Sequence, residues 1–359
     1  MYNPSGLQEQ PMPSYRASDS FVSGLGLQAQ PLVSVITPVY NGGEFLADCI
    51  ESVLAQTYQN WDCTIVNNCS QDRTLEIAQS YAAKDSRIRV VDCGEFLSII
   101  PNHNRAIHQI SANSKYCKVV MADDLLFPDC IMRMVSLAEA NPSVGIVGAY
   151  GLYGDGVHVI WRGVPYPRVV VPGREVCRMR LLGGPYVFGT PTATLIRSDF
   201  IRRKEKFYDE ANLHADSTVC YQILQEADFG FLHQILAFSR TRGESNTSFA
   251  ERMNSLQLGF LTDLLEFGPI FLDKDEYRQR LKVLTNDYYK VLAEGLLQMR
   301  GKSYWEFHRG WLRNLGVPIS WTKLMGGCVR AMLDGISHPT RAFGSLSRWW
   351  LNGQTRQGA

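Results

Sequence analysis

Two carboxylates, Asp123 and Asp124, stand side by side directly after an apolar run with strand composition, Tyr116 to Met121. Like charges at the end of a strand repel each other unless a cation offsets them. Carboxylate oxygens are hard ligands that suit Mg²⁺ or Mn²⁺, and such an ion commonly completes its shell with phosphate oxygens of a substrate. The pair therefore predicts a divalent metal bound to a diphosphate. The alternative is structural, because an Asp before Leu125 to Pro128 could cap the next turn.

Aromatic and amide side chains follow two other apolar runs of strand composition, Leu32 to Thr37 and Trp61 to Val66. After the first run, the segment Pro38 to Gly43 should stop the strand and turn. Its Tyr40 has a flat ring on which a nucleotide base could stack. The alternative is that Tyr40 packs as a turn aromatic on the next helix.

Two asparagines, Asn67 and Asn68, follow the second of these runs. An asparagine amide can accept a hydrogen bond from N3–H of uracil and donate one to O4, so either residue could read a uracil edge. The alternative for either is an Asx turn between the strand and its helix. The residue types in these loops are those of a nucleotide pocket.

The elements that must position these loops alternate between strand and helix. A helical apolar stripe is formed by Leu46, Cys49, Ile50, Val53 and Leu54. The alternation continues with helices over 73–83, 102–110 and 128–140 and strands over 87–92 and 116–121. This order predicts an α/β fold with a Rossmann-like, mostly parallel sheet flanked by helices and joined by right-handed crossovers. Because ligands bind at the carboxyl ends of such strands, the polar loops should meet at one edge.

Four motifs occur in the order and spacing of family-two glycosyltransferases, which the chain resembles over about residues 31 to 250. The motifs are Val33 to Asn41, Ser52 to Tyr58, Asn67 to Thr74 and Ala122 to Leu126. The resemblance implies a GT-A fold and the transfer of a sugar from a nucleoside diphosphate.

The resemblance also implies roles for single residues. Pro38, Tyr40 and the loop 67–70, with Asn67 and Asn68, would form the base pocket. Asp123 would contact the nucleotide and, together with Asp124, would hold Mn²⁺ or Mg²⁺ on the diphosphate. The chain departs from the family at two places, since relatives often carry Asp where the two asparagines stand and Met121 replaces the first Asp of many metal motifs.

In the second half of such enzymes an acidic residue acts as the base, and a later basic residue approaches the phosphates. By this resemblance Asp216 is the candidate base of an inverting transfer, and Arg240 and Arg242 are the candidate phosphate contacts. Thr190 lies where the family places an acceptor-facing loop. The alternative for Asp216 is a helix N-cap or a salt bridge to a nearby arginine. His214, close by, is expected to pack or to hydrogen-bond.

The chain divides by pattern into four parts. Residues 1–30 are expected to be a disordered tail, 31–150 the nucleotide-sugar-binding half, 151–250 the acceptor-binding and catalytic half, and 251–359 a helical C-terminal extension.

The first thirty residues have one basic residue, Arg16, and no apolar stretch like that of a signal peptide. Since no run of about 18 apolar residues occurs either, we expect a cytoplasmic protein.

Charge limits the partners. Lys and Arg total 36 against 35 Asp and Glu, so the chain has no overall field that would hold nucleic acid. The last 59 residues differ, with eight Lys and Arg, two acidic residues and five of the seven tryptophans. This composition suits peripheral contact with the anionic inner membrane surface, where a lipid-linked acceptor would lie. The alternative is a helical cap whose tryptophans pack on the main domain.

Together these features predict a metal-dependent, inverting glycosyltransferase of polysaccharide biosynthesis. Its donor would be a UDP-linked sugar, and its acceptor a glycan or a lipid-linked glycan. The alternative is a non-catalytic protein that binds nucleotide sugar or scaffolds a polysaccharide assembly, and the departures at Met121 and the asparagine pair are the features that keep that alternative open.

Overall fold

The computed structural model describes residues 30–337, apart from 155–157, 160–162, 241–245 and 318. All but the last residue of the expected N-terminal tail therefore lies outside the described residues. The same is true of Arg242 and of the final part of the C-terminal extension, which includes Trp349 and Trp350.

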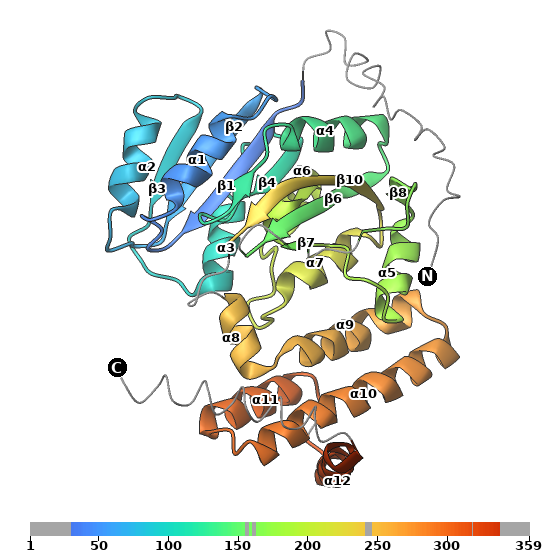
Figure 1. The fold of residues 1–359 in the computed structure, drawn as a ribbon. Helices are drawn as coiled ribbons and strands as arrows, with labels where there is room; N and C mark the ends of the chain where they lie inside the picture. Colours follow the sequence, from blue (N-terminus) through green and yellow to red (C-terminus); the bar gives the residue numbers. More distant parts are fainter. Residues whose placement is uncertain (1–29, 155–157, 160–162, 241–245, 318, 338–359) are drawn as a thin grey trace, which may run out of the picture.

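A ten-stranded mixed sheet forms the centre of the molecule, with the main order β3-β2-β1-β4-β9-β6-β10-β5, while β7 pairs with β6 and β8 with β10 (Figure 1). The strands are β1 Val33–Val39, β2 Trp61–Asn67, β3 Ile88–Asp92, β4 Tyr116–Val119, β5 Leu125–Leu126, β6 Val144–Tyr153, β7 His158–Val159, β8 Val170–Val171, β9 Thr194–Arg197 and β10 Asp228–Ser239. The strands β1, β2, β3, β4, β6 and β10 run in one direction, because β9 is antiparallel to both of its neighbours. The expected mostly parallel sheet is confirmed, with short antiparallel strands added in the second half.

Helices cover both faces of this sheet. They are α1 Leu46–Leu54, α2 Thr74–Ala82, α3 Ile99–Ile107, α4 Cys130–Ala140, α5 Gly173–Leu181, α6 Ser198–Arg202 and α7 Ala215–Ile223, with the 3-10 turn η2 at Pro191–Ala193. The C-terminal region is helical, as predicted, and contains α8 Asn246–Met253, α9 Leu256–Phe271, α10 Lys274–Leu297, α11 Lys302–Asn314 and α12 Trp321–Ser337. Figure 1 shows α9 below the sheet and α10, α11 and α12 beyond it.

Two local predictions were wrong. The first strand does not stop before Pro38 but runs to Val39, paired with β2 throughout. The Ile36 carbonyl accepts from Val120 on the β4 side, and because peptide groups alternate in direction, Pro38 also faces that side. Pairing with β4 ends at Ile36, so the missing proline N–H breaks no ladder bond.

The third helix begins at Ile99 rather than at Asn102. Pro101 therefore lies inside its first turn. Proline is tolerated there because the first N–H groups of a helix have no partner within the helix.

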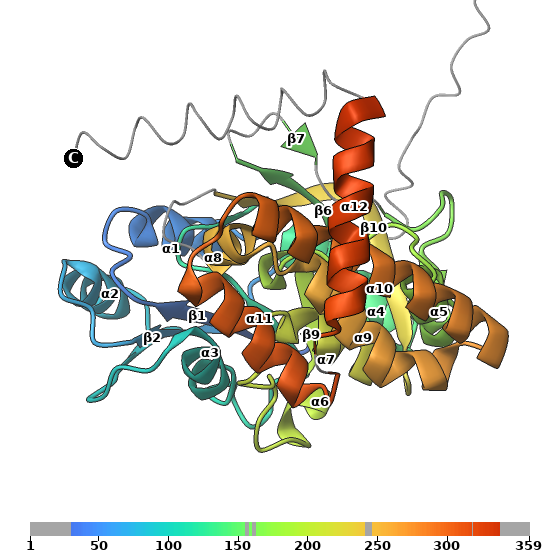
Figure 2. The ribbon, with the colours of Figure 1, turned by 90° about the horizontal axis from the view of Figure 1, so that it is seen from below.

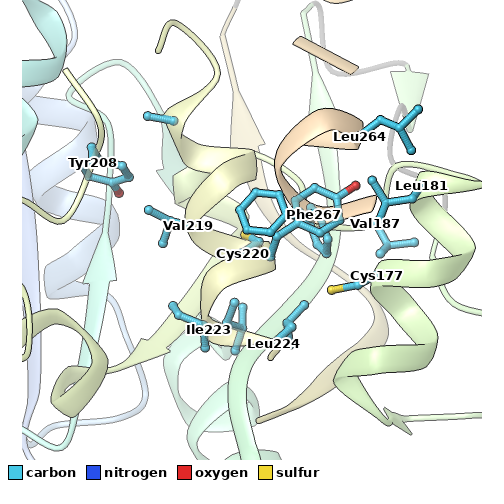
Figure 3. Packing of buried hydrophobic residues seen from close by; sticks show 14 of the residues in the cluster. Cys177, Leu181, Val187, Tyr208, Val219, Cys220, Ile223, Leu224, Leu264 and Phe267 are labelled. Carbon is cyan, nitrogen blue, oxygen red and sulfur yellow. The ribbon is translucent and has the colours of Figure 1, made fainter. Parts of the chain in front are cut away.

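Buried apolar residues form one cluster on each face of the sheet. The cluster under α1, α2 and α4 is confined to the sheet and these helices. The other cluster runs from the sheet through α5 and α7 into α9 and continues to Leu324 and Cys328 of α12. Figure 3 shows Phe267 of α9 beside Cys220 of α7, with Cys177 and Leu181 of α5 on the other side of Phe267. The C-terminal helices thus share a core with the sheet.

Candidate active site

A cleft with a volume of about 1120 Å³ opens at the carboxyl ends of the central strands. It is lined by most of the residues that the sequence singled out: Pro38, Tyr40, Asn68, Asp123, Asp124, Thr190, Asp216 and Arg240. Its walls also include Met121 and residues of α8 and α9. Residues from both halves of the chain therefore meet in one cleft, as expected from the strand directions.

Asp124 of the acidic pair is buried and tied into the fold. Its Oδ2 accepts hydrogen bonds from the Thr192 hydroxyl at 2.6 Å and the Ser239 hydroxyl at 3.0 Å, and its Oδ1 accepts from the Arg240 backbone N–H at 3.2 Å. These bonds connect the ends of β4 and β10 with η2. The alternative of a helix cap does not apply to Asp124, since the next helix, α4, begins after Asp129 and has no side-chain cap.

The electrostatic state of this pair favours a cation. Burial raises the pKa of Asp124 to about 7, and the nearby charge of Asp123 adds to the rise, although the bonds from Thr192 and Ser239 oppose it. Asp123 belongs to the same turn and also lines the cleft. In the described residues no three His, Cys, Asp or Glu side chains gather into a metal cluster. A divalent ion here would take at most these two carboxylates, and oxygen ligands of a bound substrate would have to complete its shell.

The loops after β1 and β2 are joined by hydrogen bonds. The Gly42 N–H donates to the Thr74 hydroxyl at 2.8 Å, and the Gly43 N–H donates to Asp72 Oδ2 at 2.9 Å. Asn41, with a φ of 47°, accepts from the Gln71 N–H. This loop pair forms a rigid rim beside Tyr40.

The two asparagines have different positions. Asn67 is buried and does not line the cleft; its Nδ2 donates to Asp92 at 2.8 Å, and its Oδ1 accepts from the Ser70 N–H at 3.3 Å. This bond lies within the loop after β2, but it reaches the N–H three residues on, whereas the Asx turn considered as the alternative role reaches the N–H two residues on. Asn68 lines the cleft, and its amide bonds both backbone groups of Leu97 at 2.8 and 3.0 Å.

The segment after β3 is a part of the site that sequence reasoning missed. Phe96 lines the cleft, and its ring contacts that of Tyr40 edge to face, with 4.9 Å between centroids. Arg105 of α3 holds this segment by donating to the Glu95 carbonyl and to Asn68 Oδ1. The signal for this part of the site is the pair of exposed rings, Tyr40 and Phe96, at the mouth of the cleft. The sequence of the loop is irregular and has no helix or strand period, so it does not reveal that Phe96 lies there.

Asp216 lies in the first turn of α7 and faces the cleft. It is not the N-cap, because that position belongs to His214, and in the described residues it forms no ion pair. Its Oδ1 accepts from the Ser217 N–H at 2.9 Å. Burial raises the pKa of Asp216, whereas the neighbouring His214 lowers it.

The turn that carries Asp216 is braced from below by α9. His214 Nε2 lies 3.1 Å from the Ser255 hydroxyl, and the Thr218 hydroxyl donates to Asp263 at 3.3 Å. A methyl group at Gly259 would lie 2.5 Å from the His214 ring, so α9 can approach only with glycine there.

Asp263 itself lines the cleft and is a second missed residue. Burial raises its pKa to about 8, Arg180 opposes this shift, and Asp216 adds to it. A single Asp inside the apolar run Leu261 to Leu265 was the signal that could have found it, because aspartate is seldom buried without a purpose.

The remaining predicted residues sit at the base of the cleft. Thr190 Oγ1 lies 3.4 Å from the Ser239 hydroxyl. The Arg240 guanidinium pairs with Asp48 of α1 at 2.8 Å and lies over the Phe45 ring, and its buried Nε makes no hydrogen bond to the described residues. Arg242 is outside the described residues.

Residues 34–204 match glycosyl transferase family 2. The glycosyltransferase GlyG of Streptococcus pneumoniae serotype 4 is 25% identical over 281 residues, which cover 73% of this chain and 89% of that protein. The putative teichuronic acid biosynthesis glycosyltransferase TuaG of Bacillus subtilis is 39% identical over 95 residues, which cover 26% of this chain and 37% of that protein.

Solved structures share the fold at low identity. TarS 1-349 of S. aureus in complex with UDP-GlcNAc has a TM-score of 0.55 at 16% identity and covers 78% of this chain and 79% of that one. The mannosyltransferase PcManGT of Pyrobaculum calidifontis, in complex with GDP-Man and Mn²⁺, has a TM-score of 0.52 at 14% identity and covers 92% of this chain and 87% of that one.

Proposed function

Because the chain is a family 2 glycosyltransferase with the GT-A fold, we propose that it transfers a sugar from a UDP-sugar to a hydroxyl of a glycan or lipid-linked acceptor, with inversion at the anomeric carbon. The observation that carries this proposal is the placement of the acidic pair and Asp216 in the walls of one cleft. The acidic pair faces the donor diphosphate, and Asp216 faces the acceptor. In this proposal residues 31–150 bind the donor, and residues 151–250 bind the acceptor.

Contacts at the mouth of the cleft support a nucleotide donor. The rings of Tyr40 and Phe96 are half exposed and lie edge to face, which leaves one ring face open to a base. Pro38 and Asn68 line the same region. TarS, which shares the fold, has been crystallised with UDP and with UDP-GlcNAc, and this favours uridine as the base.

The acidic turn is suited to Mn²⁺ or Mg²⁺. Asp123 and Asp124 both line the cleft, and Asp124 Oδ1 keeps a lone pair beyond its bond from the Arg240 N–H. When bound, the ion would offset negative charge on the diphosphate. The PcManGT complex with Mn²⁺ supports the same assignment.

The transfer itself is a single displacement. The acceptor oxygen forms a bond to the anomeric carbon while the bond from that carbon to the diphosphate breaks. The proton of the acceptor hydroxyl moves to the Asp216 carboxylate, which burial makes a stronger base than a solvated aspartate. The fixed turn around His214, Ser217 and Ser255 keeps this carboxylate in place.

TuaG, a putative glycosyltransferase of teichuronic acid biosynthesis, supports a setting in polysaccharide synthesis. We propose that the protein works at the cytoplasmic face of the membrane. In the described chain no helix has both the length and the apolar content needed to cross a bilayer.

Incubation with a panel of UDP-sugars, Mn²⁺ and glycan acceptors, followed by NMR of the product, tests the function. The expected product has the anomeric configuration opposite to that of the donor. A product with retained configuration would contradict the single displacement. Donor binding in calorimetry without turnover on any acceptor would contradict the proposed reaction.

A further inference from the structure

A second cavity lies in the C-terminal helical bundle, outside the walls of the cleft. It has a volume of about 480 Å³ and lies between the end of α10, one face of α11 and the start of α12. Its lining consists of Leu296, Trp305, Arg309, Arg313, Gly316, Ile319, Trp321 and Leu324. Figure 2 shows α11 and α12 side by side on the face of the molecule turned away from the sheet. We call this cavity the bundle groove.

An apolar stripe continues from the bundle groove along α12. Trp321, Met325 and Val329 recur every four residues and are exposed by 67%, 57% and 55%. Residues at this spacing lie on one side of a helix. Large apolar side chains exposed in such a continuous row indicate a surface that is covered in the working protein.

Two guanidinium groups border the same groove. Arg309 and Arg313 lie one turn apart on α11, and both are exposed. Within the described residues neither of them makes a hydrogen bond or an ion pair, whereas Lys302 on the same helix is paired with Glu306 at 3.3 Å. The occupant of the groove must therefore be apolar and must also carry negative charge.

The segment that follows α12 has no acidic side chain that could supply this charge. Residues 338–359, which follow α12, contain three Arg and no acidic residue, so they would repel the two guanidinium groups. A second copy of the chain would place the same basic patch against itself across a two-fold axis. The lipids of an anionic membrane combine the required phosphate groups and hydrocarbon.

We propose that the bundle groove and the α12 stripe form a docking surface for an anionic phospholipid membrane. Arg309 and Arg313 bind lipid phosphate groups, and Trp321 and Met325 enter the interfacial layer, where tryptophan is favoured. This surface holds the enzyme on a membrane through the C-terminal helical bundle. The inference does not depend on the donor, the metal or the base.

Vesicle flotation of the full chain tests the docking surface. We expect the wild type to float with vesicles of phosphatidylcholine and phosphatidylglycerol and to stay in solution with phosphatidylcholine alone. The double variant Arg309→Gln/Arg313→Gln should bind the anionic vesicles about 30-fold more weakly, because each basic group near such a surface contributes about fivefold. Trp321→Ser should weaken binding to a smaller extent.

The matched control is Lys274→Gln/Arg278→Gln, which removes the same charge from exposed positions at the other end of α10. These positions lie about 30 Å along the helix from Leu296, so this variant should float like the wild type. Equal flotation of the Arg309/Arg313 variant and the wild type would overturn the proposal, as would equal loss in the control. A change in oligomeric state caused by Trp321→Ser, measured by analytical ultracentrifugation, would instead make the groove a contact between copies and would also overturn it.

Discussion

Under the proposed function the cleft has a donor wall, which carries Tyr40, Asn68 and Asp123, and an acceptor wall, which carries Asp216 and Asp263. The two walls are built in different ways. On the donor wall, the loops after β1 and β2 are neighbours in sequence order, and polar bonds such as Gly43 to Asp72 and Asn68 to Leu97 hold them rigid. On the acceptor wall, Asp216 and Asp263 come from α7 and α9, and burial raises the pKa of both carboxyls. The donor wall is a preformed rim, whereas the acceptor wall concentrates titratable groups with little solvent.

Because the two walls are built differently, one is suited to donor binding and the other to the reaction. A rigid rim suits a constant ligand such as a nucleotide diphosphate, since little entropy is lost when it binds. A dry wall with a raised carboxyl pKa suits proton transfer. Changes in the donor wall should therefore alter donor affinity, and changes in the acceptor wall should alter turnover.

The largest expected effect is that of Asp216→Asn. This change keeps the size of the side chain and removes its basicity, so turnover should fall about 10²- to 10⁴-fold. Initial rates measure turnover, and calorimetry with Mn²⁺ measures donor affinity. Donor affinity should stay near the wild-type value. A parallel loss of donor affinity would place Asp216 on the donor wall and break the distinction.

Asp123→Asn should have the next largest effect, on the other wall. UDP at 100 times its Kd stabilises a protein by about 2.7 kcal/mol, and the metal-dependent part of this gain should disappear in the variant. Thermal melts with UDP, with and without Mn²⁺, measure it. The melt of Asp123→Asn without ligand is the baseline for this comparison.

Asp124→Asn is the contrast within the same pair. An amide cannot accept all three of the hydrogen bonds that Asp124 receives. The variant should lose roughly 1–3 kcal/mol of stability even without ligand. If both variants gave the same melting temperatures with and without ligand, Asp123 would not act as the metal ligand of the pair and Asp124 would not act as its structural anchor.

Gly259→Ala probes the support of the acceptor wall. The added methyl group would meet the His214 ring at 2.5 Å and displace it from Ser255. Turnover should fall about tenfold, with donor affinity unchanged, because a small misplacement at a reacting group is costly. The matched control is Gly310→Ala in α11, where an added methyl group meets nothing within 4 Å. Unchanged turnover in Gly259→Ala would show that α9 does not position Asp216.

The smallest effect should come from Asp263→Asn, seen in the pH dependence of stability. The pKa of Asp263 is about 8 in the folded protein and near 4 when unfolded, so the folded state holds this proton more tightly. The contribution of the Asp263 carboxyl to the free energy of unfolding is therefore complete below about pH 4 and is lost as the pH rises through about 8. Asparagine does not titrate and can still accept from Thr218. Between pH 7 and 9 the variant should lose less stability than the wild type, by on the order of 1 kcal/mol, in thermal melts. Parallel curves would mean that Asp263 is not buried in an uncharged form.

Much of the donor wall could be predicted from the sequence because its elements are consecutive. Strand, loop and helix alternate from Leu32 to Ala140, and the parallel direction of the strands brings the loops with Tyr40, Asn68 and Asp123 to one edge. The helical nature of the C-terminal region, which the structure describes as far as residue 337, also followed from its pattern. Local periodicity is visible in a sequence because each element buries its own apolar face.

The tertiary structure alone decided which polar side chains face the cleft. Asn67 and Asn68 are adjacent and of one type, yet Asn67 turns to Asp92 and Asn68 turns to the cleft, since alternate residues at a strand end point to opposite sides. Asp263 reaches the cleft only because α9 packs beneath α7, across some forty residues of chain. The contact between α9 and α7 is driven by the burial of apolar surface, and this driving force has no direction. No local sequence pattern therefore specifies which polar side chain of α9 the contact brings into the site.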